Sequence, residues 1–529
     1  MPAAPDMARP VVLAYDVGTS GVKAVVVDAA GRVLGSRVRG YGLSTPRPDE
    51  VEQDIDAMAT QLGAASREVI AAVGLDPGDV AAVGLTAQMF SVVALGSDGR
   101  PIRPMLSWLD QRSAAEAARI RATSGPDGGY ATFDAVLTAK DVVPRIAWLE
   151  AHEPETARRT AWYVDCKEAV AARLTGQVAI DPAGASAFRL QDPRSGGWDA
   201  ARCRSAGVPV DRLPPIVAAT DVIGRLTPDA ATLTGLPVGT PVACGTGDVA
   251  ASQIGAGAVG PGDIHLSLGT AVYFGILAAT QVADPGQRLG PLRHIAPPGW
   301  LLWLEIATGG AALSWLDRQI AGLGGPAERD HAAIDRAVEA VADEMDGLQF
   351  VPWLTGERVP LFDDAARAAF VGLGLHHGQA HLIRAVMEGV ASQIAWAYEY
   401  GLAYGITPGT IRAVGGGTIG GLWTRLIADA LDRPLEIVAE PQDAGARGAA
   451  ACALVAAGLA GDVRSAVPPT IERVVEPDPT GSRRASARLA TFRRLYPALR
   501  AATERGDTGG SAAAPAVSAD VRPPAEVLT

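Results

Sequence analysis

The chain has 529 residues, of which 48% are hydrophobic, 20% are charged and 5% are aromatic. This length and apolar content predict an ordered protein of about two to four domains and exclude intrinsic disorder for most of the chain. The 46 basic and 58 acidic residues give a net charge of −12. Such a charge excludes a general nucleic-acid or anionic-membrane binder, but not a protein that binds a nucleotide.

The cysteines and the apolar segments indicate where the protein resides. The four cysteines lie far apart, without a C-x-x-C pair, and are Cys166, Cys203, Cys244 and Cys452. We expect buried free thiols in a reducing compartment rather than zinc ligands or disulfides. Residues 1–10 contain no apolar core of a signal peptide. Residues 264–283 carry no Asp, Glu, Lys or Arg, but Gly269 and Gly275 interrupt them, which favours two buried strands over a membrane helix. A cytoplasmic protein is expected.

The first hundred residues predict a sheet with one long helix. Apolar runs bounded by turn residues predict strands at 11–15, 22–27, 33–38, 80–85 and 92–95. Apolar residues recur at helical spacing from Val51 to Val73, which predicts a helix between the third and fourth strands.

A second region after residue 240 repeats this plan. A strand at 241–245 and a short helix at 249–254 precede two further strands, at 264–268 and 271–276. These two strands enclose a Leu-Gly-Thr turn, as the first two strands of the chain enclose a Gly-Thr-Ser turn. The repeat predicts two similar lobes joined near residue 260.

The turn Asp16-Val-Gly-Thr19-Ser20 contains groups that suit a phosphate. Glycine permits a tight turn, and the N–H groups and hydroxyls that follow can bind phosphate oxygens. A carboxylate beside them suits Mg²⁺, and Lys23 would add a positive charge. The alternative is an ordinary β-turn with Asp16 as a turn former.

Two further glycine turns and one aspartate are candidates. Gly269-Thr270 follows a strand and offers the same donors, while Gly415-Gly416-Gly417 would let a flat ring or a ribose approach the backbone. For both, a structural turn is the alternative. Asp248 follows a strand and precedes a helix, so it is either an N-cap or a carboxylate presented to a substrate. The chain contains neither a dinucleotide fingerprint nor a P-loop motif.

The segment Trp108-Leu-Asp110-Gln-Arg112 suits a sugar. An aromatic plate and directional polar groups are what a sugar ring and its hydroxyls require. A salt-bridged loop is the alternative. Gly356-Glu357-Arg358 is interpreted as an ion pair, and the adjacent His376 and His377 as a surface feature rather than a metal site.

Taken together and in order, these motifs resemble the FGGY family of carbohydrate kinases, nearest to its xylulokinase branch. The resemblance covers about residues 10–500, and its most specific part is 368–388, with Phe370, Gly372 and Glu388 in place. The other matching positions are Asp16 to Ser20, Gln88-Met89, Trp108-x-Asp110-x-Arg112, Leu174-Thr-Gly176, Asp181, Ala185-Ser186, Gly245-x-Gly-Asp248, Leu268-Gly-Thr270, Gly310 to Trp315, Gly356 to Arg358 and Gly415 to Gly417.

The resemblance implies an α/β fold of two actin-like, ribonuclease-H-like lobes with an ATP and sugar cleft between them. The expected boundaries are a flexible start at 1–9, a sugar-binding lobe at 10–258, a nucleotide-binding lobe at 259–505 and a disordered tail at 506–529. Asp248 would be the general base and Asp16 the Mg²⁺ ligand. The implied phosphate and ATP contacts are Thr19, Ser20, Lys23, Gly269, Thr270, Gly310, Gly415, Gly416 and Gly417. The implied substrate contacts are Gln88, Met89, Trp108, Asp110, Asp248 and Tyr273.

The sequence departs from the xylulokinase pattern at sugar-facing positions. Phe90 and Val249 stand where that pattern has His and Asn, Arg145 stands where the first family signature has Lys, and Gly420 replaces a common Ser or Asn. Loss of two polar groups argues against D-xylulose and favours a less hydroxylated, deoxy or differently configured sugar or polyol.

The function predicted is therefore an ATP-dependent sugar or polyol kinase that uses ATP and Mg²⁺. An actin-like ATPase and a catalytically silent sugar sensor are the alternatives, and D-xylulose itself, erythritol and glycerol are the alternative substrates. We expect no nucleic-acid or membrane partner and allow for a homodimer.

Overall fold

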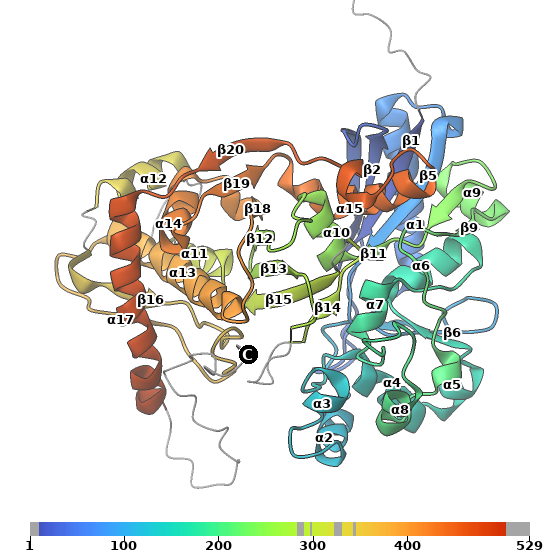
Figure 1. Ribbon diagram of the computed structural model, residues 1–529, viewed down its shortest axis with the longest axis horizontal. Helices are drawn as coiled ribbons and strands as arrows, with labels where there is room; N and C mark the ends of the chain where they lie inside the picture. Colours follow the sequence, from blue (N-terminus) through green and yellow to red (C-terminus); the bar gives the residue numbers. More distant parts are fainter. Residues whose placement is uncertain (1–9, 283–289, 297–298, 322–330, 342–344, 504–529) are drawn as a thin grey trace, which may run out of the picture. The chain divides into compact units, whose positions relative to one another are not determined.

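The computed structural model describes residues 10–282, 290–296, 299–321, 331–341 and 345–503. The chain forms two compact units, each built from segments that are distant in the sequence (Figure 1). Unit 1 takes the described residues of Met1–Val259, Leu277–Leu301 and Asp443–Pro469. Unit 2 takes those of Gly260–Ile276, Leu302–Gln442 and Thr470–Thr529. The expected flexible start (1–9) and disordered tail (506–529) lie outside the described residues.

Unit 1 is built on a mixed sheet with the order β3-β2-β1-β5-β10-β9, and β11 also pairs with β5. The first three strands form antiparallel hairpins, whereas β5 runs parallel to both β1 and β10. The strands are β1 (Val11–Val17), β2 (Gly21–Asp28), β3 (Val33–Gly40), β5 (Val80–Ala87), β9 (Val222–Arg225), β10 (Pro241–Ala243) and β11 (Thr246–Gly247). These bounds confirm the strands predicted at 11–15, 22–27, 33–38, 80–85 and 241–245, whereas the strand predicted at 92–95 pairs outside this sheet.

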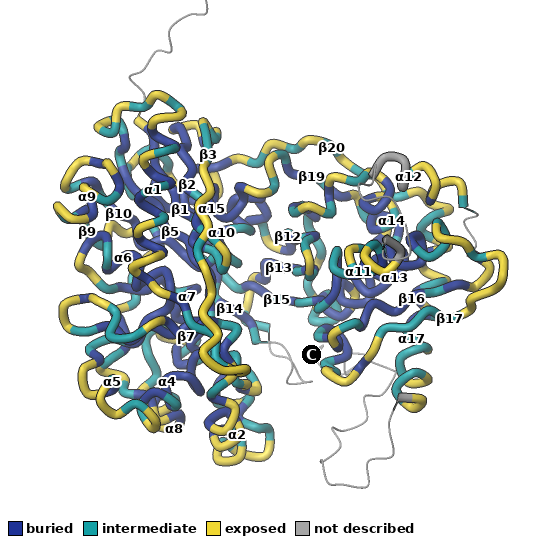
Figure 2. Tube along the Cα trace, turned by 180° about the vertical axis from the view of Figure 1, so that it is seen from behind, coloured by how far each residue is buried: buried dark blue, intermediate teal, exposed yellow. Residues whose placement is uncertain are grey.

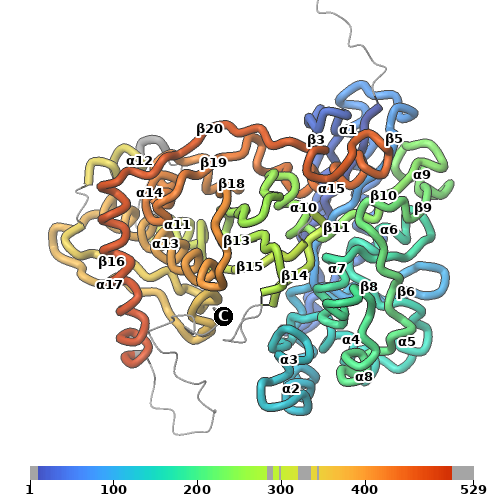
Figure 3. The backbone as a smooth tube through the Cα atoms, in the orientation of Figure 1, coloured from blue at the N-terminus to red at the C-terminus, as the bar shows by residue number. Residues whose placement is uncertain are grey.

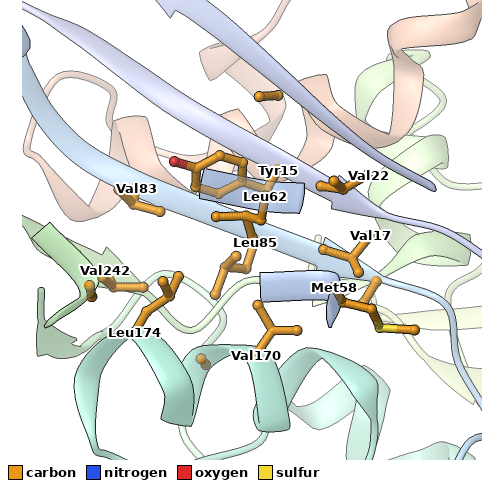
Figure 4. Close-up of a cluster of buried hydrophobic side chains, with 14 of the residues drawn as sticks. Tyr15, Val17, Val22, Met58, Leu62, Val83, Leu85, Val170, Leu174 and Val242 are labelled. Atoms are coloured by element: carbon orange, nitrogen blue, oxygen red, sulfur yellow. The ribbon is translucent and has the colours of Figure 1, made fainter. Parts of the chain in front are cut away.

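Apolar residues on both faces of these strands require a cover on each side of the sheet, since successive side chains alternate between faces. On one face Leu13, Tyr15 and Val17 pack with α1 (Ile55–Val73) and α6 (Cys166–Thr175) in a single core. Figure 4 shows Met58 and Leu62 of α1 and Val170 and Leu174 of α6 gathered around Tyr15 and Val17 and their neighbours on β2, β5 and β10.

The other face is covered by α15 (Ala444–Ala456), although this helix is distant in the sequence (Figure 3). Its alanines pack with Val12, Ala14 and Ala82 of the sheet. The structure therefore differs from the continuous lobes expected at 10–258 and 259–505, because the described residues of 277–301 and residues 443–469 pack with unit 1. Periodicity could not assign α15 to that sheet, because an alanine-rich helix fits many apolar surfaces.

Helix α1 begins later than its apolar pattern predicted. Glu52 and Gln53 form the short strand β4 (Glu52–Gln53), paired with β7 (Met105–Leu106). Asp54 then caps the helix, because its side chain accepts hydrogen bonds from the backbone of Asp56 and Ala57. The short strand brings Gln53 to the end of the sheet, where it contributes to the site described below.

A smaller cluster completes unit 1 around β6 (Val93–Leu95) and β8 (Trp162–Val164). Figure 2 shows its buried centre and the exposed outer turns of α2 and α5. Its helices are α2 (Ala114–Thr123), α3 (Tyr130–Phe133), α4 (Val142–His152), α5 (Pro154–Arg159), α7 (Pro182–Ala187) and α8 (Ala200–Ala206). Unit 1 also contains α9 (Pro228–Thr234), α10 (Asp248–Gly255) and α16 (Val463–Ala466). All four cysteines are free and buried, as expected.

The second sheet has the order β14-β15-β13-β12-β18-β19-β20. Its strand β12 is antiparallel to β13 and parallel to β18, as β1 is to β2 and β5, which confirms the predicted repeat. The strands are β12 (Ile264–Leu268), β13 (Val272–Ala278), β14 (Leu292–Arg293), β15 (Trp300–Ile306), β18 (Ile411–Val414), β19 (Leu435–Val438) and β20 (Ile471–Val475).

The helices of unit 2 are mostly longer. They are α11 (Gly310–Ala321), α12 (His331–Glu339), α13 (Gln379–Leu402), α14 (Gly421–Leu431) and α17 (Pro479–Thr503), beside the hairpin β16 (Gln349–Val351) and β17 (Ala369–Val371). The charge-free stretch from residue 264 forms the two strands predicted for it. Within the described ranges, no helix is long and apolar enough to cross a membrane.

Candidate active site

Asp16 lies near the carboxyl end of β1, beside the parallel strand β5. It is in register with Lys23 on β2 and with Thr86 on β5. The N–H of Gly18 donates to the carbonyl of Gly21 at 2.9 Å, which closes the turn between β1 and β2. Open α/β sheets place ligand-binding groups at the carboxyl ends of their parallel strands. This edge is therefore the candidate site of unit 1.

The carboxyl group of Asp16 is crowded by the first turn of α15. A Cβ atom added at Gly445 would lie 2.4 Å from Asp16 Oδ2, so only glycine lets the helix approach the carboxylate this closely. Burial raises the pKa of Asp16 to about 6, with Asp443 adding to the rise and Lys23 opposing it. Asp16 is therefore mostly ionised at neutral pH, although burial disfavours its charge.

Asp248 is the first residue of α10, directly after β11. The N-cap of this helix is Gly247, and Asp248 Oδ1 accepts a hydrogen bond from the N–H of Val249 at 2.8 Å. Burial raises the pKa of Asp248 to about 7, and the charge of Asp16 adds to the rise. Asp248 is therefore not the N-cap, and its carboxyl group titrates close to neutral pH.

Asp16 and Asp248 form an electrostatically coupled pair that fits a divalent cation. Both carboxyl groups have raised pKa values, and Asp16 raises that of Asp248, so their negative charges are under-compensated. Carboxylate oxygens are the ligands that Mg²⁺ prefers, usually one or two of them together with water. Burial is the main cause of both raised pKa values, and the charge of Asp16 adds to the rise at Asp248. A bound cation would favour the charged form of both carboxyl groups.

Thr19 connects three polar side chains next to this pair. Its hydroxyl donates to Gln88 Oε1 at 3.1 Å and accepts from Trp108 Nε1 at 2.9 Å. Gln53 Nε2 donates to the carbonyl of Thr19 at 2.9 Å, and Gln53 Oε1 accepts a hydrogen bond from Gln88 Nε2 at 2.9 Å. The structure thus brings together Thr19, which the resemblance assigns to phosphate, with Gln88 and Trp108, which it assigns to substrate. It adds Gln53, which no motif indicated.

Ser20 and Lys23 occupy different surroundings. Ser20 is exposed at the tip of the turn. Lys23 Nζ lies 2.8 Å from Asp443 Oδ1, and both side chains are largely buried. The charge of Lys23 is therefore engaged with two carboxylates of unit 1, Asp443 through the ion pair and Asp16 electrostatically.

The loop after β5 is held by a buried arginine. Met89 is buried against Gly247, and Phe90 has a left-handed backbone, with φ 64°. Arg145 donates to the carbonyls of Phe90, of Trp108 (2.8 Å) and of Asp110 (2.9 Å). Arg145 thereby ties the Gln88–Phe90 loop to the Trp108–Asp110 loop, which gives the family signature position a structural role.

Asp110 is not presented to a ligand. Its carboxylate is fully buried, forms an ion pair with Arg112 at 2.8 Å and accepts the N–H of Val51 at 2.7 Å. Arg112 also contacts Glu52 at 2.9 Å. This is the salt-bridged loop weighed as the alternative for the segment, so direct substrate contact by Asp110 does not agree with the structure, whereas Trp108 is partly exposed.

In unit 2, three predicted residues converge at the end of β12. The N–H of Gly310 donates to the carbonyl of Gly269 at 2.8 Å, and the N–H of Ala311 donates to the carbonyl of Thr270 at 3.1 Å. The start of α11 is therefore bonded to the Gly269-Thr270 turn. Thr270 is exposed at this turn, where a hydroxyl beside a helix N-terminus suits an anion.

The three glycines Gly415 to Gly417 lie against the same strand end. Gly415 has φ 96°, and a Cβ atom there would lie 2.6 Å from the carbonyl oxygen of Leu268, so the turn requires glycine. Gly416 is exposed, with nothing within 4 Å of its Cβ position. Tyr273, predicted to face substrate, is partly exposed and stacks on Trp303 with ring centroids 4.9 Å apart.

The predicted ion pair between Glu357 and Arg358 does not form. Glu357 is buried and accepts the N–H groups of Ala307 and Arg358 (2.9 and 2.7 Å), while the Arg358 side chain lies 3.7 Å from Asp364. Burial raises the pKa of Glu357 to about 8. Glu357 therefore fixes the segment that leads from β15 into α11 instead of neutralising its neighbour.

Comparison with known families agrees with this arrangement. The N-terminal domain model of the FGGY family of carbohydrate kinases matches residues 11–255, and the C-terminal domain model matches residues 264–457. The chain belongs to the FGGY family of carbohydrate kinases. The predicted family, fold class and enzyme class are thereby confirmed, and the chain is a sugar kinase of this ATP-using family.

Individual relatives cover nearly the whole chain. The xylulose kinase of Escherichia coli (strain K12) is 28% identical over 491 residues, which is 92% of this chain and 99% of that protein. The gluconokinase of Bacillus subtilis (strain 168) is 26% identical over 463 residues, covering 84% and 87%. Among solved structures, a xylulose kinase from Rhodospirillum rubrum has a TM-score of 0.83 and 29% identity, covering 94% of this chain and all of that one. The Brucella ovis structure, titled a xyloylose kinase, has a TM-score of 0.84 and 28% identity, covering 93% and 100%.

Proposed function

We propose that this kinase transfers the γ-phosphoryl group of ATP to a hydroxyl of a small, ketopentose-like sugar or a polyol, with Asp248 as the general base. The observation that carries the proposal is the position and the pKa of Asp248. Its carboxyl group stands at the end of β11, and its pKa of about 7 lets it take up a hydroxyl proton near neutral pH.

Asp16 is the proposed Mg²⁺ ligand. When bound, Mg²⁺ supplies positive charge that offsets the charge of the phosphates. Asp16 contributes a carboxylate whose pKa is raised by burial, and Gly445 lets the first turn of α15 pack against it without a side chain. The exposed Ser20 offers a hydroxyl for a phosphate at the neighbouring turn, whereas Thr19 holds Gln88 and Trp108 in place.

Unit 2 is the proposed ATP-binding unit. Thr270 would donate its hydroxyl to a phosphate oxygen beside the start of α11. The backbone at Gly415 to Gly417 would lie against the flat surfaces of the nucleoside, since no side chain there blocks its approach.

The acceptor is proposed to be a sugar or polyol other than D-xylulose. Gln88 is buried with its amide bonded to Thr19 and Gln53, so Trp108 and the residues around Asp248 remain to face a ligand. Phe90 and Val249 are both partly exposed and apolar. A sugar hydroxyl that lost its water against them would gain no hydrogen bond in return.

A coupled ADP-release assay tests this function. The acceptors are ketopentoses, ketohexoses, pentitols, erythritol and glycerol, each with Mg-ATP, and Asp248→Asn serves as the matched protein for background ATP hydrolysis. We expect one acceptor to raise ADP release far above the rate without acceptor. ADP release that no acceptor stimulates would contradict the kinase proposal and indicate a nucleotide hydrolase. Binding of a sugar without turnover would indicate a sensor.

The setting proposed for this activity is the cytoplasm, where ATP is abundant and the four free thiols would remain reduced. A homodimer is also proposed, and light scattering coupled to size exclusion tests it directly. A mass near 54.3 kDa, that of one chain, would contradict the dimer without bearing on the kinase activity.

A further inference from the structure

A buried ion cluster lies on the first turn of α6, in the interior of unit 1. Lys167 Nζ is 2.6 Å from Glu168 Oε1 and 3.4 Å from Asp181 Oδ1. The three side chains are at most 4% exposed. The proposed reaction assigns no role to any of these three residues.

This cluster contacts the segment that precedes Asp248 at two points. Lys167 Nζ donates to the carbonyl of Cys244 at 3.1 Å. The Thr246 hydroxyl donates to Asp181 Oδ2 at 2.8 Å, two residues before Asp248. The backbone from Cys244 to Thr246 is therefore held by side chains that themselves form an ion pair.

The same turn of α6 holds the loop that carries Phe90. Asp165 Oδ1 accepts the N–H of Ser91 at 3.0 Å and the N–H of Cys166 at 2.7 Å. Glu168 in turn accepts the N–H of Asp165 through Oε2 at 3.2 Å. One helix turn thus fixes both the loop after β5 and the strand end before Asp248.

Stability alone gives no reason for a buried ion cluster at this place. Well-packed apolar side chains of similar volume are often as stabilising as a buried ion pair. Burial opposes the charge of Lys167, but Cys244, Glu168 and Asp181 together raise its pKa well above the ordinary value, so the lysine remains charged. The cluster supplies directional hydrogen bonds to the Cys244 carbonyl and the Thr246 hydroxyl. Apolar side chains could not supply them.

We propose that Lys167, Asp181 and Thr246 are positioning residues that set the place of the Asp248 carboxylate for proton transfer. This inference rests on the proposed function, in which Asp248 is the base. A displacement of about 1 Å at a reacting group can lower a rate about 100-fold, whereas ATP binding on unit 2 would be unaffected.

The test compares Thr246→Val with Thr246→Ser, using the best acceptor of the screen. Valine removes the hydroxyl at nearly constant volume, and serine retains it. The matched control is Thr234→Val, because Thr234 is also fully buried and donates its hydroxyl to a protein acceptor, the carbonyl of Ala230, at 2.7 Å. We expect Thr246→Val to lower kcat about 10- to 100-fold with the KM for ATP within about 2-fold. Thr246→Ser and Thr234→Val should retain most of the wild-type kcat.

A double-mutant cycle separates positioning from general damage. If Thr246 acts through Asp248, Thr246→Val should cause little further loss of the residual kcat in the Asp248→Asn background. An equal loss in both backgrounds, or a wild-type kcat for Thr246→Val, overturns the inference. If Thr246→Val does not fold, Asp181→Asn replaces it in the test. An unchanged kcat in Asp181→Asn would also overturn the inference.

The outcomes also distinguish this inference from the proposed function. A fully active Asp248→Asn overturns the base assignment and the inference together. An inactive, folded Asp248→Asn beside a fully active Thr246→Val overturns only the inference.

Discussion

Lys23 and Asp443 are 420 positions apart in the sequence, yet Lys23 Nζ lies 2.8 Å from Asp443 Oδ1. The ion pair joins β2 to the residue that precedes α15, beside the Asp16 carboxyl group. Asp443 raises the pKa of Asp16 and Lys23 lowers it, so the two partners act on the candidate metal ligand in opposite directions. The charge state of Asp16 therefore depends on the docking of a helix from late in the chain.

The first prediction concerns Asp248 as the base. Asp248→Asn should lower kcat at least about 100-fold, the usual scale for the loss of a general base, while ATP binding persists. Steady-state kinetics with the best acceptor and calorimetric titration with ATP measure the two effects. Near-wild-type turnover would show that Asp248 has no part in proton transfer.

The second prediction concerns the stability of the same variant. The pKa of Asp248 rises from 3.8 to about 7 on folding, so the folded state binds the proton more tightly than the unfolded chain. Its contribution to stability is complete below about pH 4 and is lost as the pH rises through 7. Asp248→Asn should therefore raise the free energy of unfolding at pH 8 by about 1–3 kcal/mol, and much less at pH 4.5.

Denaturant unfolding at the two pH values provides that measurement. The control is Asp211→Asn, because Asp211 is an exposed aspartate of unit 1. A stability change that is the same at both pH values would contradict the raised pKa of Asp248.

The third prediction concerns Asp16 and Mg²⁺. Asp16→Ala should lower kcat, and excess Mg²⁺ should restore it only in part, because a metal-orienting carboxylate acts on the transition state as well as on affinity. A titration of kcat against Mg²⁺ measures both quantities. Complete rescue would reduce Asp16 to an affinity role, and an unchanged rate would remove it from the site.

The fourth prediction concerns the close approach of α15 to Asp16. Gly445→Ala places a methyl group within 2.4 Å of Asp16 Oδ2, so the carboxylate or the helix must move. We expect at least a tenfold loss of kcat and a weaker response to Mg²⁺. Gly461→Ala is the matched control, since Gly461 lies in the same segment with nothing within 4 Å of its Cβ position. Equal effects of the two alanines would contradict the proposed crowding.

The fifth prediction concerns acceptor choice. D-xylulose should be a poor substrate relative to the best acceptor, and Phe90→His with Val249→Asn should raise its relative kcat/KM. An unmatched buried polar group costs about 1–3 kcal/mol, which corresponds to roughly a 5- to 150-fold preference. Competition between D-xylulose and the native acceptor measures the ratio. A wild-type enzyme that prefers D-xylulose over every other acceptor tested would refute this interpretation of Phe90 and Val249.

Local patterns predicted those parts of the site that are local in the chain. The turn after Asp16 follows from a strand, a glycine and two hydroxyl residues in sequence, and the structure places it between β1 and β2. The glycines of unit 2 also lie in the predicted turns, Gly269 after β12 and Gly415 to Gly417 after β18. Their roles in binding remain predictions.

Contacts between distant segments could not be predicted in this way. Asp443 and Gly445 match no motif by themselves, and their importance follows only from the docking of α15 beside Asp16. Asp110 illustrates the opposite error, because a polar residue in a sugar-like motif is buried against Arg112. Neither burial nor the partner of a carboxylate can be inferred from spacing alone.

The interleaving of unit 1 also affects the order in which the protein folds during synthesis. Helix α15 packs on the face of the sheet that contains Val12 and Ala14, so these residues lack that helix until residues 444–456 have left the ribosome. At about 5–20 residues per second, this delay is on the order of 20–90 seconds after β1 emerges. During that interval the nascent chain lacks both this helix and Asp443, the ion-pair partner of Lys23. Apolar surface exposed in this way is the kind of surface that chaperones bind.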